Sequence, residues 1–153
     1  MKQKLAIGLV LGAAATAALA GPIEDQIRFR QSAYSFLGWN TAKIKAQAVD
    51  HPETFNKEEV VAAANAVAAV ANSGLLGLYG EGSAEGTGWK PSRLKVEYFE
   101  KKDEVKEIEA GFIAEANELQ KVAASGDVGA IKEQFGKVGK TCKSCHDLIR
   151  VRE

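Results

Sequence analysis

Apolar residues recur at intervals of three and four along most of this chain, most regularly near its end. Seven residues there are separated by 3, 4, 3, 4, 3 and 4 positions: Val128, Ile131, Phe135, Val138, Cys142, Cys145 and Ile149. This spacing places them on one face of an α-helix. The chain lacks the alternating Val, Ile and Thr runs that are typical of strands. The pattern predicts an all-α fold with both cysteines facing the core.

Two helices are expected in the first half of the chain. The first begins at Ile23, and the segment "DHPETFN" ends it with Pro52 and polar turn residues. The second follows Asn56, which with Glu59 resembles a capping box, and this alanine-rich helix ends at Gly74. The inward stripe of the first helix is expected to be Ile27, Tyr34, Leu37, Ile44 and Ala48.

A glycine-rich segment separates these helices from two others. Six glycines within residues 74–88, followed by Pro91, predict a loop. The third helix is expected over about 92–124 and the fourth over 128–149, with Gly126 and Asp127 as caps between them. The inward positions of the third are expected to be Val96, Phe99, Val105, Ile108, Phe112, Ala116, Leu119 and Val122. Short turns within each helix pair predict an antiparallel, up-down-up-down four-helix bundle.

The first 20 residues have the composition of an export signal. Lys2 and Lys4 precede an apolar run, and small residues at Ala18 and Ala20 suit cleavage before Gly21. A membrane anchor is the alternative, but the apolar run is shorter than the roughly 20 residues a bilayer requires and is rich in Ala and Gly. We therefore expect a cleaved signal peptide over 1–20, a single domain over 21–153, a periplasmic location and no membrane span.

The charge of the domain excludes one class of partner. The whole chain has 20 basic and 20 acidic side chains, and the leader contains two of the lysines and no acid, which leaves 18 and 20, a net charge of −2. Nucleic-acid binding needs a basic surface, so we expect none here.

The two cysteines occur in "TCKSCHDLIR", residues 141–150, and are the only ones in the chain. A redox dithiol of the thioredoxin kind begins a helix after a strand, a setting this sequence lacks. Zinc needs four ligands, and the only other histidine is His51. Cys-x-x-Cys-His is the attachment signature of a c-type haem, in which two thiols bond to the vinyl groups and the next histidine binds the iron. We therefore expect one covalent haem c per chain, held by Cys142 and Cys145, with His146 as axial ligand.

The sixth iron position lacks an obvious ligand. The only methionine, Met1, leaves with the leader. In the expected bundle His146 lies level with residues 28–37. At a rise of 1.5 Å per residue, His51 is roughly 25 Å further along the first helix. We therefore interpret His51 as a solvated turn histidine. A lysine would have to be held neutral by burial. We expect five-coordinate iron with an open distal side that favours small diatomic guests. Candidates to line this side are Tyr34, Leu37, Phe99 and Ile108, of which Leu37 and Ile108 suit the ordinary core better.

With these features the chain resembles the cytochrome c′ family, in particular the kind found in purple sulfur bacteria. The segments that carry the resemblance are "RQSAYSFLGWNTAKIKA", "AAANAVAAVANSG", "LYGEG", "EYFEKKDEV" and "FGKVGKTCKSCHDLIR", in order along the chain. The resemblance implies an exported four-helix bundle with a C-terminal haem, usually a homodimer. We expect that dimer to form through the first and second helices, because small residues of the second allow close packing.

The resemblance also implies roles for four further residues. Arg30 and Gln31 would contact the haem propionates, Tyr34 would cover the distal face of the iron, and Arg150 would lie near the proximal histidine. The first three fall at the level of His146 in the expected bundle, and Arg150 is one turn beyond it. Arg150 equally suits an ordinary role as a cation at a helix C-terminus.

Several residues have less specific expectations. Ser92 and Arg93, at the expected start of the third helix, are candidate propionate contacts, although Arg93 better suits an exposed turn. Lys140 and Lys143 surround the haem edge and suit either a solvated face or the steering of an acidic redox partner. Trp39 and Trp89 are assigned to packing.

The function that follows is that of a periplasmic, high-spin c-type cytochrome that binds NO and CO and can transfer electrons. A dedicated electron carrier without a gas-binding role is the alternative. We do not expect an enzyme, because the inferred distal side offers no histidine for acid–base chemistry.

Overall fold

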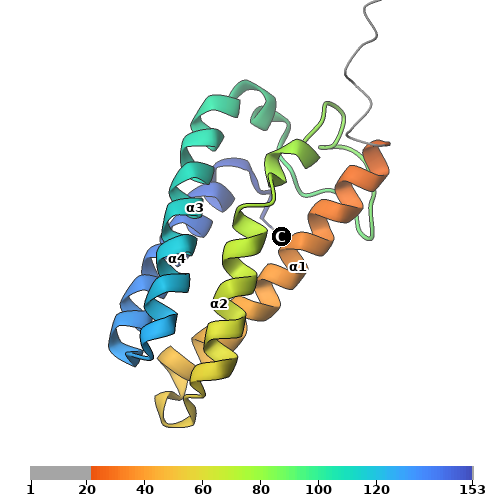
Figure 1. The fold of residues 1–153 in the computed structure, drawn as a ribbon. Helices are drawn as coiled ribbons and strands as arrows, with labels where there is room; N and C mark the ends of the chain where they lie inside the picture. Colours follow the sequence, from red (N-terminus) through yellow and green to blue (C-terminus); the bar gives the residue numbers. More distant parts are fainter. Residues whose placement is uncertain (1–21, 153) are drawn as a thin grey trace, which may run out of the picture.

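Four long helices form the body of the part described by the computed structural model, residues 22–152 (Figure 1). They are α1 (Ile23–Lys45), α2 (Lys57–Ala71), α3 (Lys102–Ser125) and α4 (Val128–Ile149). Each packs against the next in the chain, and the short joints at α1–α2 and α3–α4 make these pairs antiparallel. The predicted up-down-up-down four-helix bundle is confirmed. The predicted signal peptide lies outside the described residues, and none of the described helices is long and apolar enough to cross a membrane.

The joint between α1 and α2 follows from the predicted stop signals. α1 passes into a π-helical turn, η2 (Ala46–Asp50), in which the His51 amide donates to the Ala46 carbonyl at 2.8 Å. Pro52 then begins the 3₁₀ turn η3 (Pro52–Thr54), because proline has no amide to continue the ladder. The helical stretch formed by α1 and η2 therefore ends at Asp50, the first residue of the predicted stop segment.

The predicted capping box at the start of α2 is half present. The Asn56 side chain accepts from the Glu59 amide at 3.2 Å, as expected. The Asn56 amide donates to Gln47 Oε1 at 2.8 Å, and Gln47 Nε2 donates to Glu59 Oε2 at 2.6 Å. In a full capping box the Glu59 side chain would accept directly from the Asn56 amide. Here the Gln47 side chain bridges these two groups and so connects the helical turn η2 to the start of α2.

The predicted caps between α3 and α4 are both present. Gly126 adopts a left-handed conformation with φ of 80° at the end of α3. Asp127 Oδ1 accepts from the Ala130 amide at 3.0 Å at the start of α4. The sharp turn between these helices is thus explained by two adjacent residues.

The predicted start of the third helix is wrong, because α3 begins at Lys102. Residues 92–95 are instead extended and lie beside the chain that leaves α4, with Leu94 bridged to Arg150. The 3₁₀ turn η5 (Val96–Glu100) follows, and Val96 is 55% exposed although an inward position was predicted. Backbone pairing with a segment more than 50 residues away overrides the local helical pattern.

The buried side chains form two clusters. The main core lies between the four helices and includes Leu37, Ile44, Val60, Val67, Leu119, Ile131 and Val138. A second group, which we call the loop-side cluster, consists of Tyr79, Ala84, Leu94, Tyr98, Val105 and Ile149. Its aromatic members come from the segment between α2 and α3, and Ile149 is the last residue of α4. The C-terminal end of α4 is therefore covered by non-helical chain.

Candidate functional site

Both cysteines lie on the inner side of α4, where the two clusters meet. Cys142 packs against the main core and Cys145 against the loop-side cluster, and neither forms a disulfide. Burial raises the pKa of both thiols, that of Cys145 to about 11. They are therefore protonated at neutral pH, unlike the thiolates of zinc sites and redox dithiols. Within residues 22–152 no group of three or more His, Cys, Asp or Glu side chains could hold a metal ion.

His146 follows directly in the last turn of α4 and has an exposed side chain. Partial burial lowers its pKa, and the nearby Arg150 lowers it further, while Asp147 acts in the opposite direction. The imidazole is therefore neutral at pH 7, the form that binds a metal. Two thiols and a neutral imidazole within five residues of one helix are the donor set that a covalently attached haem requires.

Three tyrosines gather beside Cys145. The Tyr79 hydroxyl donates to the Tyr34 hydroxyl at 2.9 Å, and the rings of Tyr79 and Tyr98 are 5.1 Å apart between centroids. Burial raises the pKa of Tyr34 to about 12 and that of Tyr79 well above 10, and a charge on Cys145 would raise both further. These phenols are neutral at pH 7. Tyr34 therefore lies near Cys145, and its distal position stays a prediction.

Tyr79 and Tyr98 were not singled out from the sequence. Both lie outside the four α-helices, Tyr79 just after η4 (Leu75–Leu78) and Tyr98 within η5, where the 3.6-residue spacing of an α-helix does not indicate which side chains face inward. The signal that could have found Tyr79 is its place in "LYGEG", one of the segments that carry the family resemblance.

Arg30 is buried and connects α1 to the loop between α2 and α3. Its Nη1 donates to the Leu78 carbonyl at 3.2 Å and to Ser83 Oγ at 3.1 Å. Its Nη2 donates to the Ser83 carbonyl and to Ser92 Oγ, both at 2.9 Å. The guanidinium carbon lies 4.4 Å from the centroid of the Tyr79 ring. Arg30 therefore has a structural role that the sequence did not indicate, and its propionate contact stays a prediction.

Gln31 holds the next part of this loop. Its Oε1 accepts from the Trp89 amide at 2.8 Å and from the Lys90 amide at 3.2 Å, while Nε2 donates to the Lys90 carbonyl at 2.8 Å. Trp89 and Trp39 are 70% and 65% exposed, so their predicted role in packing is wrong. Gln31 too stays a predicted propionate contact.

Ser92 and Arg93 are adjacent but face different partners. Ser92 Oγ accepts from Arg30, as described, whereas Arg93 Nε and Nη2 donate to the Val151 carbonyl at 3.3 and 2.9 Å. Arg93 lines a hollow of about 460 Å³ beside His146; its other lining residues are Arg150, Val151 and Arg152. Arg150 thus lies in the same hollow as His146, and its place on the proximal side of a haem stays a prediction.

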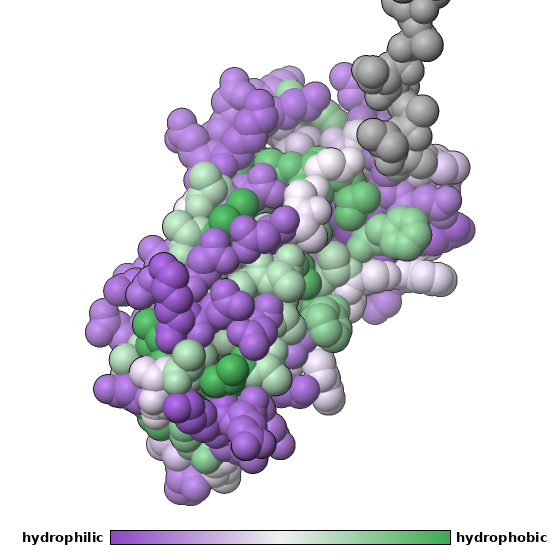
Figure 2. Space-filling view, in the orientation of Figure 1, coloured by the Kyte–Doolittle hydropathy of each residue, from purple (hydrophilic) through white to green (hydrophobic). Residues whose placement is uncertain are grey.

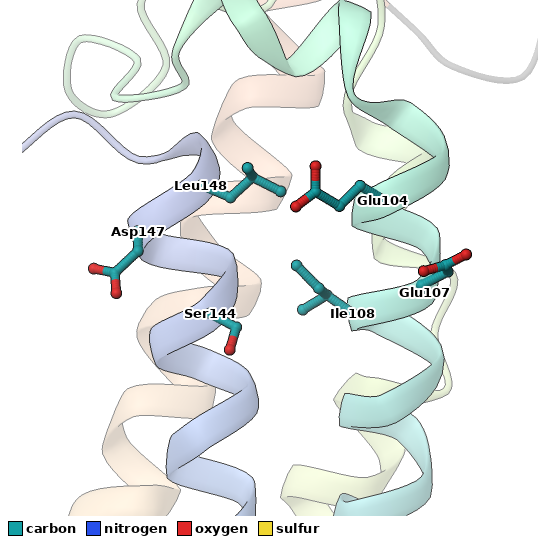
Figure 3. A pocket seen from close by; sticks show the side chains of 6 residues that line it. All are labelled: Glu104, Glu107, Ile108, Ser144, Asp147 and Leu148. Atoms are coloured by element: carbon teal, nitrogen blue, oxygen red, sulfur yellow. The ribbon is translucent and has the colours of Figure 1, made fainter.

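The four candidates for the distal lining are divided among three places. Tyr34 and Phe99 pack against the loop-side cluster together with Cys145, and Leu37 belongs to the main core. Ile108 lines an acidic surface groove of about 590 Å³ between α3 and α4. Figure 3 shows its side chain near Leu148 and Glu104. Tyr34 and Phe99 are therefore the candidates that share a cluster with Cys145.

The hydrogen bonds between Arg30 and the loop after α2 lead to a prediction about stability. Arg30→Met should lower the free energy of unfolding by about 3 kcal/mol, because it removes hydrogen bonds from a charged donor and leaves buried acceptors unpaired. Chemical denaturation measures this loss, and amide exchange should quicken in residues 78–92. Arg28→Met is the matched control, since the Arg28 side chain is exposed and, among residues 22–152, pairs only with Asp25 and the face of Trp89. Equal loss in both variants would contradict the structural role of Arg30.

Comparison with known proteins assigns the chain to a family. The family model for cytochrome c′ matches residues 25–150. The cytochrome c′ of Rhodocyclus tenuis is 48% identical over 130 residues, which cover 85% of this chain and 96% of that protein.

Solved structures agree. A cytochrome c′ with ligand-controlled dimer dissociation is 44% identical, with a TM-score of 0.80 over 86% of this chain and 98% of that one. The nitric oxide complex of a variant cytochrome c′ from Alcaligenes xylosoxidans is 20% identical and shares the fold, with a TM-score of 0.74 over 87% of this chain and 98% of that one. The chain therefore belongs to the cytochrome c′ family, whose cofactor is covalent haem c, and it has the two cysteines for its attachment.

Proposed function

We propose that this protein is a periplasmic, high-spin c-type cytochrome that binds NO and CO on the open side of its haem and can transfer electrons. Cys142 and Cys145 would hold the haem, and His146 would be the one protein ligand of the iron. The haem supplies an iron that changes oxidation state and binds a diatomic gas. The observation that carries the proposal is that the described residues near Cys145 include no methionine and no second histidine for the sixth iron position.

His51, the second histidine, lies at the wrong end of the bundle. It occupies the turn between α1 and α2, whereas His146 lies in the last turn of α4, at the end where α1 begins. Its side chain is exposed, and Nδ1 is 3.3 Å from Glu53 Oε1. Rotation of a side chain cannot cover this separation, which amounts to most of the length of α1.

Tyrosine and lysine do not supply the ligand either. The phenols nearest Cys145 are kept neutral by burial, and a neutral phenol is a poor iron ligand compared with phenolate. No lysine within residues 22–152 is buried, so none is held as the neutral amine that ligation requires. The iron is therefore five-coordinate in this proposal.

The surroundings of Cys145 favour a small, uncharged guest. Tyr34, Tyr79 and Phe99 contribute aromatic surface. The donors of Arg30 behind Tyr79 are occupied by the loop, and the Glu109 carboxylate near Cys145 disfavours anions on that side. The nitric oxide complex of the distant relative from Alcaligenes xylosoxidans supports the choice of gas. Electron transfer is supported by the exposed position of His146, which places the haem attachment near the surface.

Spectroscopy tests the proposed coordination. We expect high-spin absorption and EPR spectra of the haem-loaded protein in the ferric and ferrous states, changed by NO and, in the ferrous state, by CO. Substituting His146 by Gly should alter the resting spectrum, because the axial ligand is lost. A low-spin, six-coordinate spectrum before gas is added would overturn the proposal in favour of a dedicated electron carrier.

Gas-binding kinetics test the distal role of Tyr34. Tyr34→Ala should speed association of CO several-fold, because it removes a ring beside Cys145 and opens access to the iron. Tyr34→Phe is the matched variant, since it keeps the ring and loses only the hydrogen bond with Tyr79. Stopped-flow mixing measures both rates, and an unchanged rate in Tyr34→Ala would remove this side chain from the path of the gas.

The proposal includes a homodimer. Among the described residues, three of the large apolar side chains that are exposed lie on α1. Phe29, Phe36 and Trp39 are 64%, 54% and 65% exposed, and Figure 2 shows pale green apolar side chains along the α1 edge. In α2 most of the small residues are used inside the bundle, including Ala63 and Ala64. Large apolar side chains at neighbouring surface positions of a helix are typical of an interface.

Sedimentation tests this interface. Phe36→Glu should shift the protein from dimer to monomer at micromolar concentration, because it buries a charge in the contact. Val96→Glu is the control, since Val96 is exposed to a similar extent on η5. A wild-type protein that sediments as a monomer at every concentration, or an equal effect of both variants, would contradict the α1 interface.

A further inference from the structure

In the described part of the chain, three arginines and Val151 line the hollow beside His146. Arg93 comes from the extended segment before η5, and Arg150, Val151 and Arg152 come from the chain after α4. The Leu94–Arg150 bridge joins these two segments, and the Val151 amide also donates to the Arg93 carbonyl at 2.9 Å. The lining is therefore a built feature of two paired segments.

The three guanidinium groups differ in how they are held. Arg93 is fixed to the Val151 carbonyl by Nε and Nη2. Arg152 Nη2 donates to Asp147 Oδ1 at 2.6 Å, and this carboxylate also pairs with Lys143. Arg150 is exposed, and its side chain makes no hydrogen bond with the described part of the chain. Within residues 22–152, Asp147 therefore pairs with Lys143 and Arg152, whereas Arg150 retains its donors.

His146 shares this positive surrounding and retains its donor capacity. Neither of its ring nitrogens makes a hydrogen bond with residues 22–152. When one ring nitrogen of a histidine binds a metal, the other carries a proton. This N–H usually donates a hydrogen bond to an acceptor, which makes the metal-binding nitrogen more basic. The lining of the hollow offers donors where such an acceptor belongs.

We propose that this hollow binds a small oxyanion, such as inorganic phosphate, which accepts hydrogen bonds from Arg150 and from the outer ring N–H of His146. Arg93 and Arg152 add positive charge, and fork-shaped guanidinium donors match the geometry of an oxyanion. A pocket of about 460 Å³ has ample room for such an ion. The anion site lies on the His146 side, apart from the aromatic side proposed for gases.

The bound anion should be linked to the oxidation state of the haem. An anion that accepts from His146 makes this ligand more basic, and it also stabilises the additional positive charge of ferric iron. Phosphate should therefore bind the ferric protein more tightly than the ferrous protein and lower the midpoint potential. Because linkage is reciprocal, a tenfold difference in affinity corresponds to about 59 mV for one electron. This linkage rests on the proposed ligation by His146, whereas the binding of the anion does not.

Calorimetry with inorganic phosphate tests the binding, using the haem-loaded protein against sodium chloride at the same ionic strength. We expect saturable binding to the ferric form and an affinity about tenfold weaker in Arg150→Gln, the loss expected for one charge-assisted hydrogen bond. Lys132→Gln, which removes an exposed cation at the other end of α4, should bind as the wild type does. Relaxation of the ³¹P signal by the paramagnetic iron should place the ion near His146.

Each of the other possible results would overturn a specific part of this inference. No saturable binding, or equal weakening in Arg150→Gln and Lys132→Gln, would show that the cations only screen charge or are occupied by the haem propionates, and the site would be rejected. Binding without a change in potential would reject the link to His146. The gas-binding proposal is decided separately, by the spectrum before and after NO, so failure of one does not imply failure of the other.

Discussion

The buried guanidinium of Arg30 is the interaction on which the end of this bundle depends. A four-helix bundle leaves its ends open, and here the segment between α2 and α3 must cover the end where α4 presents Cys145 and His146. Arg30 donates to two carbonyls and two hydroxyls of that segment and stacks on Tyr79. A buried charge is tolerated only when its donors are satisfied, so these bonds define one conformation of the loop.

The covered end has two chemically different sides. Towards the interior, Tyr34 and Tyr79 share a hydrogen bond and remain neutral because burial raises the pKa of each phenol. Towards the solvent, His146 is surrounded by arginines that favour its neutral, ligating form. A haem attached to α4 would thus have an aromatic side suited to uncharged gases and a cationic side suited to anions.

The sequence predicted much of this arrangement, for reasons that can be traced to particular residues. The regular spacing from Val128 to Ile149 indicated both the helix and the inward position of the cysteines. Gly126 and Asp127 marked the turn before it through local backbone chemistry. The start of α3 was misplaced because residues 92–95 pair with the chain after α4, and no local pattern reports a contact so distant in sequence.

By itself the sequence determined the helices, their order, the attachment motif and the lack of a methionine ligand, because each depends on residue type and spacing within a few turns. Only the tertiary structure decided that Arg30 ties down the loop, that Tyr79 reaches Tyr34, and that Arg93 meets Arg150 beside His146. These contacts join segments about 45 to 60 residues apart. Their formation depends on how the bundle brings the ends of its helices together, which periodicity along a single helix does not encode.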